Sequence, residues 1–111
     1  MSTPELDDYL LVLTTCPDKE TAQRIAHSLV DSKLAACAQI GQAIESVYSW
    51  QGQTHCDQEF PLQLKCTKGH YLQLQHNLLQ LHPYEVPQII AIPLSYGLPA
   101  YFNWIKENSP S

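Results

Sequence analysis

The densest group of polar side chains in the sequence lies in the segment His82-Pro-Tyr-Glu-Val-Pro87. The two prolines restrict the backbone, so His82, Tyr84 and Glu85 are expected to point in fixed directions. An imidazole, a phenol and a carboxylate held in one loop could bind a ligand or transfer protons in a small enzyme. A structural role is the alternative, because His82 could instead bond to the backbone at the end of the preceding helix.

Two further charged residues, Glu59 and Lys65, lie six residues apart in a segment of alternating polar and apolar side chains. An even separation places both side chains on the same face of a strand. At about 3.3 Å per residue they are too far apart to form an ion pair. They are either ordinary surface charges or part of a cleft between subunits.

Tyr48 and Trp50 stand just before the pair Gln51-Gly52, which is typical of a two-residue hairpin turn because Gly supplies a positive φ. An isolated aromatic side chain near a hairpin tip would be exposed. We therefore expect these two rings to pack against another subunit, with a stacking platform for a ligand as the alternative.

The elements that must position these residues begin with a continuous apolar run over 9–15, typical of a strand buried on both faces. Asp18 can accept hydrogen bonds from the free N–H groups of a helix start. A helix is predicted over 18–32, because apolar residues recur there at spacings of three and four.

The middle of the chain predicts a long β-hairpin, with strands over 36–50 and 54–67. Pro61 lacks an N–H group, so it should mark an edge position or a bulge. Such a hairpin exposes backbone edge groups, and a second chain would cover them. If the turn has two residues, counting back along both strands places Cys37 opposite Cys66, whereas a bulge near Pro61 would turn them to opposite faces.

A second helix is predicted over 69–81, ended by Pro83, followed by a strand over 88–93 and a last helix that opens near Pro99. This order predicts an α+β, ferredoxin-like βαββαβ sandwich with a long hairpin and a C-terminal helix. The chain would be one domain over 1–111 with a flexible N-terminus at 1–8. One sheet face is left bare, and another subunit should cover it.

The chain has six Lys and Arg against eleven Asp and Glu, a net charge of −5. That charge disfavours binding to nucleic acid or to an anionic membrane. The sequence lacks a long apolar run and a basic leader, so a cytoplasmic location is expected. Four cysteines without a CxxC pair are expected to be free thiols. We expect no catalytic activity, since the sequence contains no P-loop, HExxH, nucleophile elbow or dinucleotide fingerprint.

Several short strings, in this order, resemble the CutA divalent-cation-tolerance family: Lys33-Leu-Ala-Ala-Cys37, Ser46-Val-Tyr48-Ser-Trp50-Gln-Gly52, Glu59, Lys65 with Thr67, His82-Pro-Tyr-Glu-Val-Pro87 and Tyr101-x-x-Trp104-Ile105. The resemblance implies a homotrimer of ferredoxin-like subunits whose hairpins reach between subunits. It also implies a cytoplasmic role in tolerance to metal ions such as copper, an architecture similar to trimeric PII-type signalling proteins, and no defined reaction.

The resemblance, together with the residues above, gives two sets of expected site residues. A ligand cleft is expected from Trp50, Glu59, Lys65, His82, Tyr84 and Glu85. The trimer interface is expected to include Tyr48, Trp50 and Trp104. A purely structural or interaction trimer is the remaining alternative.

Copper or another divalent cation is the ligand that the resemblance implies, and no cofactor is otherwise required. Copper prefers thiolate and imidazole ligands. Family members would draw on a first-strand cysteine, but here Thr14 takes the matching position and Cys16 follows two residues later. Near the end of the second helix, His76 and His82 are the nearby imidazoles. Cys16 and His82 are therefore the candidate metal ligands.

Overall fold

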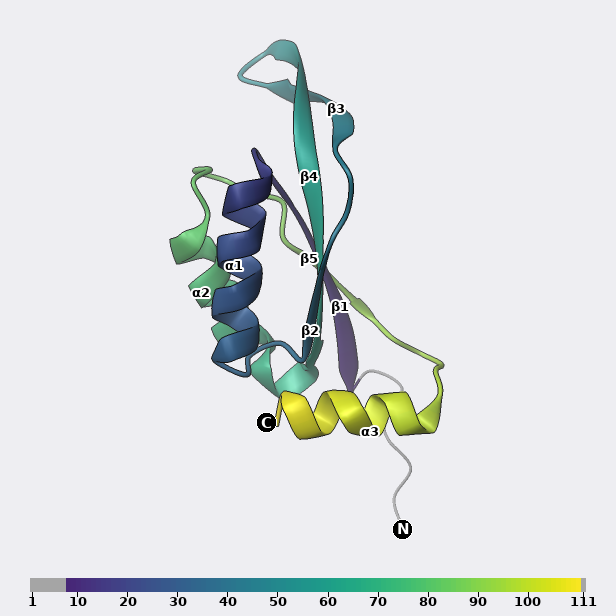
Figure 1. Cartoon of the computed structure of the whole chain (residues 1–111). Coiled ribbons are helices and arrows are strands. Elements are labelled where there is room, and N and C mark those ends of the chain that lie inside the picture. Colours follow the sequence, from purple (N-terminus) through teal and green to yellow (C-terminus); the bar gives the residue numbers. More distant parts are fainter. Residues whose placement is uncertain (1–7, 111) are drawn as a thin grey trace.

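The computed structural model describes residues 8–110, so the predicted flexible terminus at 1–8 lies outside the described residues apart from Asp8. Strands and helices follow one another largely as the sequence predicts (Figure 1). They are β1 (Tyr9–Cys16), α1 (Lys19–Asp31), β2 (Cys37–Ile40), β3 (Ile44–Trp50), β4 (Gln53–Thr67), a 3-10 turn (Lys68–His70), α2 (Tyr71–Leu81), β5 (Ile90–Pro93) and α3 (Pro99–Asn108).

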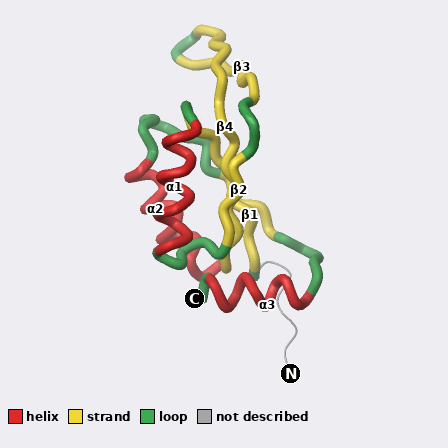
Figure 2. The backbone as a smooth tube through the Cα atoms, in the orientation of Figure 1, coloured by secondary structure: helices red, strands yellow, loops and turns green. Residues whose placement is uncertain are grey.

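The strands form one antiparallel sheet in the order β2-β4-β1-β5, and β3 pairs with the far end of β4. The helices α1 and α2 lie together on one face of this sheet, and α3 crosses its lower end (Figure 2). The predicted antiparallel α+β sandwich is confirmed. No helix within residues 8–110 is long and apolar enough to cross a membrane.

Local signals fix the ends of the helices. Asp18 Oδ1 accepts a hydrogen bond of 2.7 Å from the Thr21 N–H, which starts α1 and lowers the pKa of the Asp18 carboxyl. Helix α2 ends at Leu81, and His82 is already extended because Pro83 follows it. Both ends agree with the sequence prediction.

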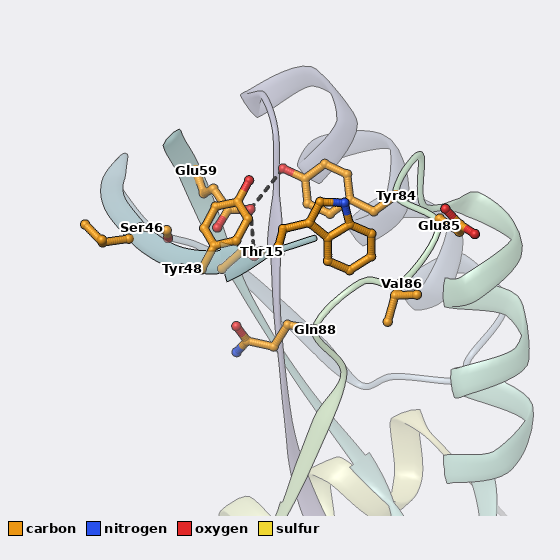
Figure 3. Close-up of a pocket in the computed structure, with 10 residues that line it drawn as sticks. Thr15, Ser46, Tyr48, Glu59, Tyr84, Glu85, Val86 and Gln88 are labelled. Carbon is orange, nitrogen blue, oxygen red and sulfur yellow. Dashed lines mark hydrogen bonds between the residues drawn. The ribbon is translucent and has the colours of Figure 1, made fainter. Parts of the chain in front are cut away.

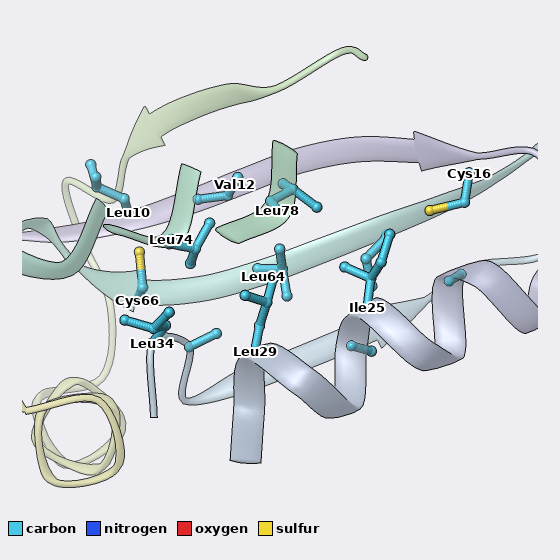
Figure 4. Packing of buried hydrophobic residues seen from close by; sticks show 14 residues of the cluster. Leu10, Val12, Cys16, Ile25, Leu29, Leu34, Leu64, Cys66, Leu74 and Leu78 are labelled. Carbon is cyan, nitrogen blue, oxygen red and sulfur yellow. The ribbon is translucent and has the colours of Figure 1, made fainter. Parts of the chain in front are cut away.

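The core lies between the sheet and the pair α1 and α2 (Figure 4). Every second residue of β1 and of the inner part of β4 points into it, and the apolar stripes of both helices close it. Its fully buried members include Val12, Leu62, Leu64, Cys66, Ile25, Leu29, Leu74 and Leu78. Burial of each large aliphatic side chain contributes about 1.5–3 kcal/mol, so this half of the molecule is held by its own chain.

The other half is a projecting β-hairpin formed by residues 44–59, which we call the hairpin arm (Figure 1). It makes the molecule elongated, with principal dimensions of 53 × 25 × 24 Å and a radius of gyration of 14.9 Å, against about 13 Å for a compact chain of this length. From Gln53 to Glu59, β4 pairs with β3 alone, because its pairing with β1 stops at Phe60.

The turn of the arm has the predicted two residues. Trp50 pairs with Gln53, and both Gln51 and Gly52 have positive φ values, 51° and 78°. Two consecutive positive φ values are what a type I′ turn requires.

The predicted continuous strand over 36–50 is wrong, because it is interrupted at residues 41–43. Ile40 pairs with Leu62 and Ile44 with Glu59, so three residues on one side face two on the other. A Cβ atom on Gly41 would lie 2.8 Å from Pro61 Cγ. Glycine therefore permits the close approach of the two strands at this irregularity.

This extra residue changes the pairing of the cysteines. Cys37 faces Lys65, and Cys66 faces Leu10 on the other neighbour of β4. The predicted pairing of Cys37 with Cys66 is therefore wrong, and the alternative, a bulge near Pro61 that turns the two side chains to opposite faces, is confirmed. Cys66 points into the core and is fully buried, whereas Cys37 is half-buried on the other face.

Candidate functional site

A cavity of about 630 Å³ lies where the hairpin arm meets the end of β1 and the loop that follows α2 (Figure 3). Both regions that the sequence analysis singled out, the hairpin aromatics and the segment 82–87, contribute to its wall. The lining residues are Thr15, Ser46, Val47, Tyr48, Trp50, Glu59, Tyr84, Glu85, Val86 and Gln88.

Glu59 is the central polar residue of this cavity, and only 8% of its surface is exposed. Its Oε2 atom accepts hydrogen bonds from Thr15 Oγ1 at 3.0 Å and from the Tyr84 hydroxyl at 2.9 Å (Figure 3). Two donors from different segments fix the orientation of the carboxylate. Glu59 was expected in a ligand cleft between subunits, and the cavity that it lines here is formed by the single chain.

The phenol of Tyr84 is held as a proton donor. Burial and the hydrogen bond to the Glu59 carboxylate both raise the pKa of Tyr84 above its ordinary value of 10.0, and burial has the larger effect. The hydroxyl therefore stays protonated at neutral pH and continues to donate to Glu59.

His82 positions Tyr84 instead of facing the cavity. Its Nε2 lies 2.8 Å from the Thr15 carbonyl oxygen, which can only accept, so Nε2 carries the proton. Nδ1 then accepts the backbone N–H of Tyr84 at 3.1 Å. The ring is 6% exposed and ties the loop to the end of β1. This corresponds to the backbone-bonding alternative that the sequence left open.

The arm contributes an aromatic and acidic face. Ser46, Tyr48 and Trp50 of β3 share this face with Asp57 and Glu59 of β4. The Tyr48 hydroxyl donates to Asp57 Oδ2, which raises the pKa of the phenol. Tyr48 also stacks on the ring of His55, with centroids 5.6 Å apart. The Tyr48 ring is therefore held in place against the arm.

Lys65 and Trp104 lie away from the cavity. Lys65 shares a face of β4 with Glu59, as the even spacing predicts, but it lies about 20 Å further along the strand. Its Nζ donates to Gln39 Oε1 and to the Tyr101 hydroxyl, both at 3.2 Å. Trp104 stacks on Tyr101 at 5.6 Å on the exposed side of α3. The structure of the single chain does not bring these two residues to the ligand site.

The candidate metal ligands do not have the geometry of a metal site. Both ring nitrogens of His82 are engaged in hydrogen bonds. The Cys16 thiol is fully buried in the core, and burial raises its pKa to about 11, which disfavours the thiolate that binds a metal. Within residues 8–110, no three His, Cys, Asp or Glu side chains are grouped so that they could hold a metal ion.

Three residues at the site were not predicted from the sequence: Thr15 and Gln88, which line the cavity, and Asp57, which accepts the Tyr48 hydroxyl beside it. Asp57 could have been found, because it lies two residues before Glu59 and alternation places both on one face. Thr15 ends the predicted first strand, but only the folded chain shows that it faces Glu59. Gln88 gave no signal of its own.

Comparison with known proteins gives a consistent result. A family model described as CutA1 divalent ion tolerance protein matches residues 10–108. The divalent-cation tolerance protein CutA of Thermus thermophilus is 41% identical over 99 residues, which are 89% of this chain and 96% of that protein. The crystal structure of CutA1 from the psychrotrophic bacterium Shewanella sp. SIB1 has a TM-score of 0.92 at 48% identity and covers 96% of this chain and 100% of that one. The chain therefore belongs to the CutA1 divalent ion tolerance family.

Proposed function

We propose that this chain is a cytoplasmic homotrimer that acts as a binding or signalling module in the response to divalent metal ions such as copper. Its relatives carry divalent-cation tolerance in their names. The observation that carries the binding role is the cavity around Glu59. Its volume of about 630 Å³ falls within the usual range for small-molecule sites, about 300–1,000 Å³.

A binding role is favoured over catalysis by the chemistry of the cavity wall. The described lining residues offer hydroxyls, carboxylates and aromatic rings, but no imidazole and no thiol. His82, the proposed acid or base of the alternative small enzyme, uses both ring nitrogens to hold the loop. The Tyr84 hydroxyl donates a hydrogen bond to the Glu59 carboxylate, so the two side chains form a fixed, preorganised surface.

Self-association is supported by the hairpin arm. Its strands leave unpaired edges, and it exposes Ile44, Val47 and Trp50, with Val47 66% exposed. The sheet face opposite the helices also exposes Ile90 and Ile92. Apolar surface of this kind is typical of an oligomer interface. We propose that Tyr48, Trp50 and Trp104 contribute to contacts between the three subunits.

The metal is proposed as the signal to which the module responds and not as a cofactor held by Cys16 and His82. The buried thiol and the fully bonded imidazole would both have to be released before they could bind copper. The response would instead depend on ligand occupancy of the cavity around Glu59.

One experiment tests both parts of the proposal. A strain that lacks this gene receives wild type, Glu59→Gln or Glu45→Gln and is grown with increasing copper, while the purified proteins are examined by sedimentation. Glu45 is the matched control, because it carries the same charge on the opposite, exposed face of the arm. We expect all three proteins to sediment at about three times the 12.6 kDa chain mass, and Glu59→Gln alone to lose copper tolerance.

Three outcomes would contradict the proposal. A monomeric wild type would exclude the homotrimer. Full tolerance with Glu59→Gln would exclude a role for the cavity and favour a purely structural trimer. If wild type converts a metabolite and Glu85→Gln abolishes this activity, the alternative function as a small enzyme would be favoured.

A further inference from the structure

We infer that the cavity around Glu59 binds an organic ammonium ion, with its charge against the Glu59 carboxylate and its carbon skeleton among the aromatic rings. This inference rests on the proposed function in taking the cavity as a binding site, and it adds the chemical class of the ligand.

The charge of the cavity wall favours a cation. Glu59 and Glu85 line it, and none of the described lining residues is Lys or Arg. A third carboxylate, Asp57, lies on the same face of the arm as Glu59 and accepts the hydroxyl of the lining residue Tyr48. An anionic ligand would meet repulsion on this wall without a compensating positive side chain.

The hydrogen bonding of Glu59 leaves room for a donor. Both Thr15 and Tyr84 donate to Oε2. Within residues 8–110, no hydrogen bond reaches Oε1, and that atom is not among those fully enclosed by protein. Oε1 of this largely buried carboxylate, which is 8% exposed, can therefore accept a further hydrogen bond from a ligand. An N–H group of a bound ammonium would satisfy Oε1 and balance the charge.

The remainder of the wall suits an organic cation better than a metal ion. It presents the rings of Tyr48, Trp50 and Tyr84, together with the apolar side chain of Val86. An ammonium ion over an aromatic face gains about 0.5–2 kcal/mol, and apolar side chains can hold its carbon chain. A divalent metal would need several oxygen, nitrogen or sulfur ligands, and the described part of the chain groups no three acidic, His or Cys side chains for one.

A charge series of otherwise similar probes tests the inference: hexylammonium, hexanol and hexanoate, each titrated into the trimer by calorimetry. We expect hexylammonium to bind at least about tenfold more tightly than hexanol, and hexanoate not to bind. Glu59→Gln should weaken hexylammonium binding about tenfold, whereas Glu45→Gln on the opposite face should leave it unchanged.

The results separate this inference from the proposed function. Equal binding of hexanol and hexylammonium, or tighter binding of hexanoate, would overturn the ammonium class but keep a ligand cavity. A dissociation constant above about 1 mM for hexylammonium would also overturn the ammonium class. Loss of copper tolerance in Glu59→Gln would still support the proposed function in that case. A third result would assign the cavity to the metal instead. In that case wild type does not bind hexylammonium but binds Cu(II) titrated alone, and Glu59→Gln abolishes the Cu(II) binding.

Discussion

The two halves of this molecule are stabilised in different ways, although one strand runs through both. Between Phe60 and Thr67, β4 pairs with β1 along one edge and with β2 along much of the other, and its inner side chains reach the core beneath α1 and α2. Between Gln53 and Glu59 it pairs with β3 alone. Within the hairpin arm, Glu59 is the one residue that is buried, with 8% of its surface exposed. The sandwich therefore stabilises itself, whereas the arm has no core of its own.

This contrast explains where the candidate site lies. The cavity forms where the arm leaves the sandwich, so its wall combines a rigid part and a projecting part. Thr15 and the loop held by His82 belong to the self-stabilised half. Tyr48 and Trp50 belong to the arm, and each is 41% exposed. A bound molecule or a neighbouring subunit at this junction would connect the two halves.

The largest expected effect comes from removing a core side chain from the sandwich. Leu78→Ala removes a fully buried side chain from α2, so we expect the free energy of unfolding to fall by about 2–5 kcal/mol. Leu72→Ala is the control on the same helix, since Leu72 is 77% exposed, and it should change the value by less than about 0.5 kcal/mol. Urea denaturation at one protein concentration measures both. Similar losses in the two variants would contradict a core beneath α2.

Short-range signals in the sequence predicted the elements well. The Asp18 cap, the stop at Pro83 and the Gln51-Gly52 turn each depend on a few neighbouring residues, and all three are present in the structure. The apolar spacings of three and four within 18–32 likewise predicted that one face of α1 is buried.

Features that depend on contacts between distant segments were predicted less well. The break at residues 41–43 follows from the close approach of Gly41 to Pro61, and the alternation of side chains does not encode it. The predicted pairing did not include this one-residue shift, so it placed Cys37 opposite Cys66 instead of Lys65. Similarly, His82 and Glu59 were both found as candidates, but the links through Thr15 and Tyr84 that join them arise only in the folded chain.

The buried thiols of the sandwich predict a smaller, pH-dependent effect. Burial raises the pKa of Cys16 and of Cys66 from 9.0 to about 11. Above pH 9 the unfolded chain loses these thiol protons before the folded chain does, so the unfolded state is favoured as pH rises. We expect the free energy of unfolding to decrease between pH 9 and pH 11, as measured by denaturation at each pH.

Two variants locate the origin of this decrease. The double variant Cys16→Ala, Cys66→Ala should show a shallower decrease, because two of the titrating groups are gone. Cys56→Ser should retain most of the decrease, since Cys56 is exposed on the arm and solvent screens its interaction with Glu45. A decrease that depends on Cys56 instead would contradict the assignment to the sandwich.

The smallest effect is expected at the tip of the arm. Gly52 has a φ of 78°, and a Cβ atom there would meet nothing within 4 Å. Gly52→Ala therefore introduces backbone strain without a steric clash, at a cost of about 1 kcal/mol. If the arm opens independently of the core, amide hydrogen exchange should become faster in β3 and in residues 53–59, while the amides of β1 keep their protection. A uniform increase in exchange across β1 and β3 would show that the two halves unfold as one unit, and the contrast between them would then be wrong.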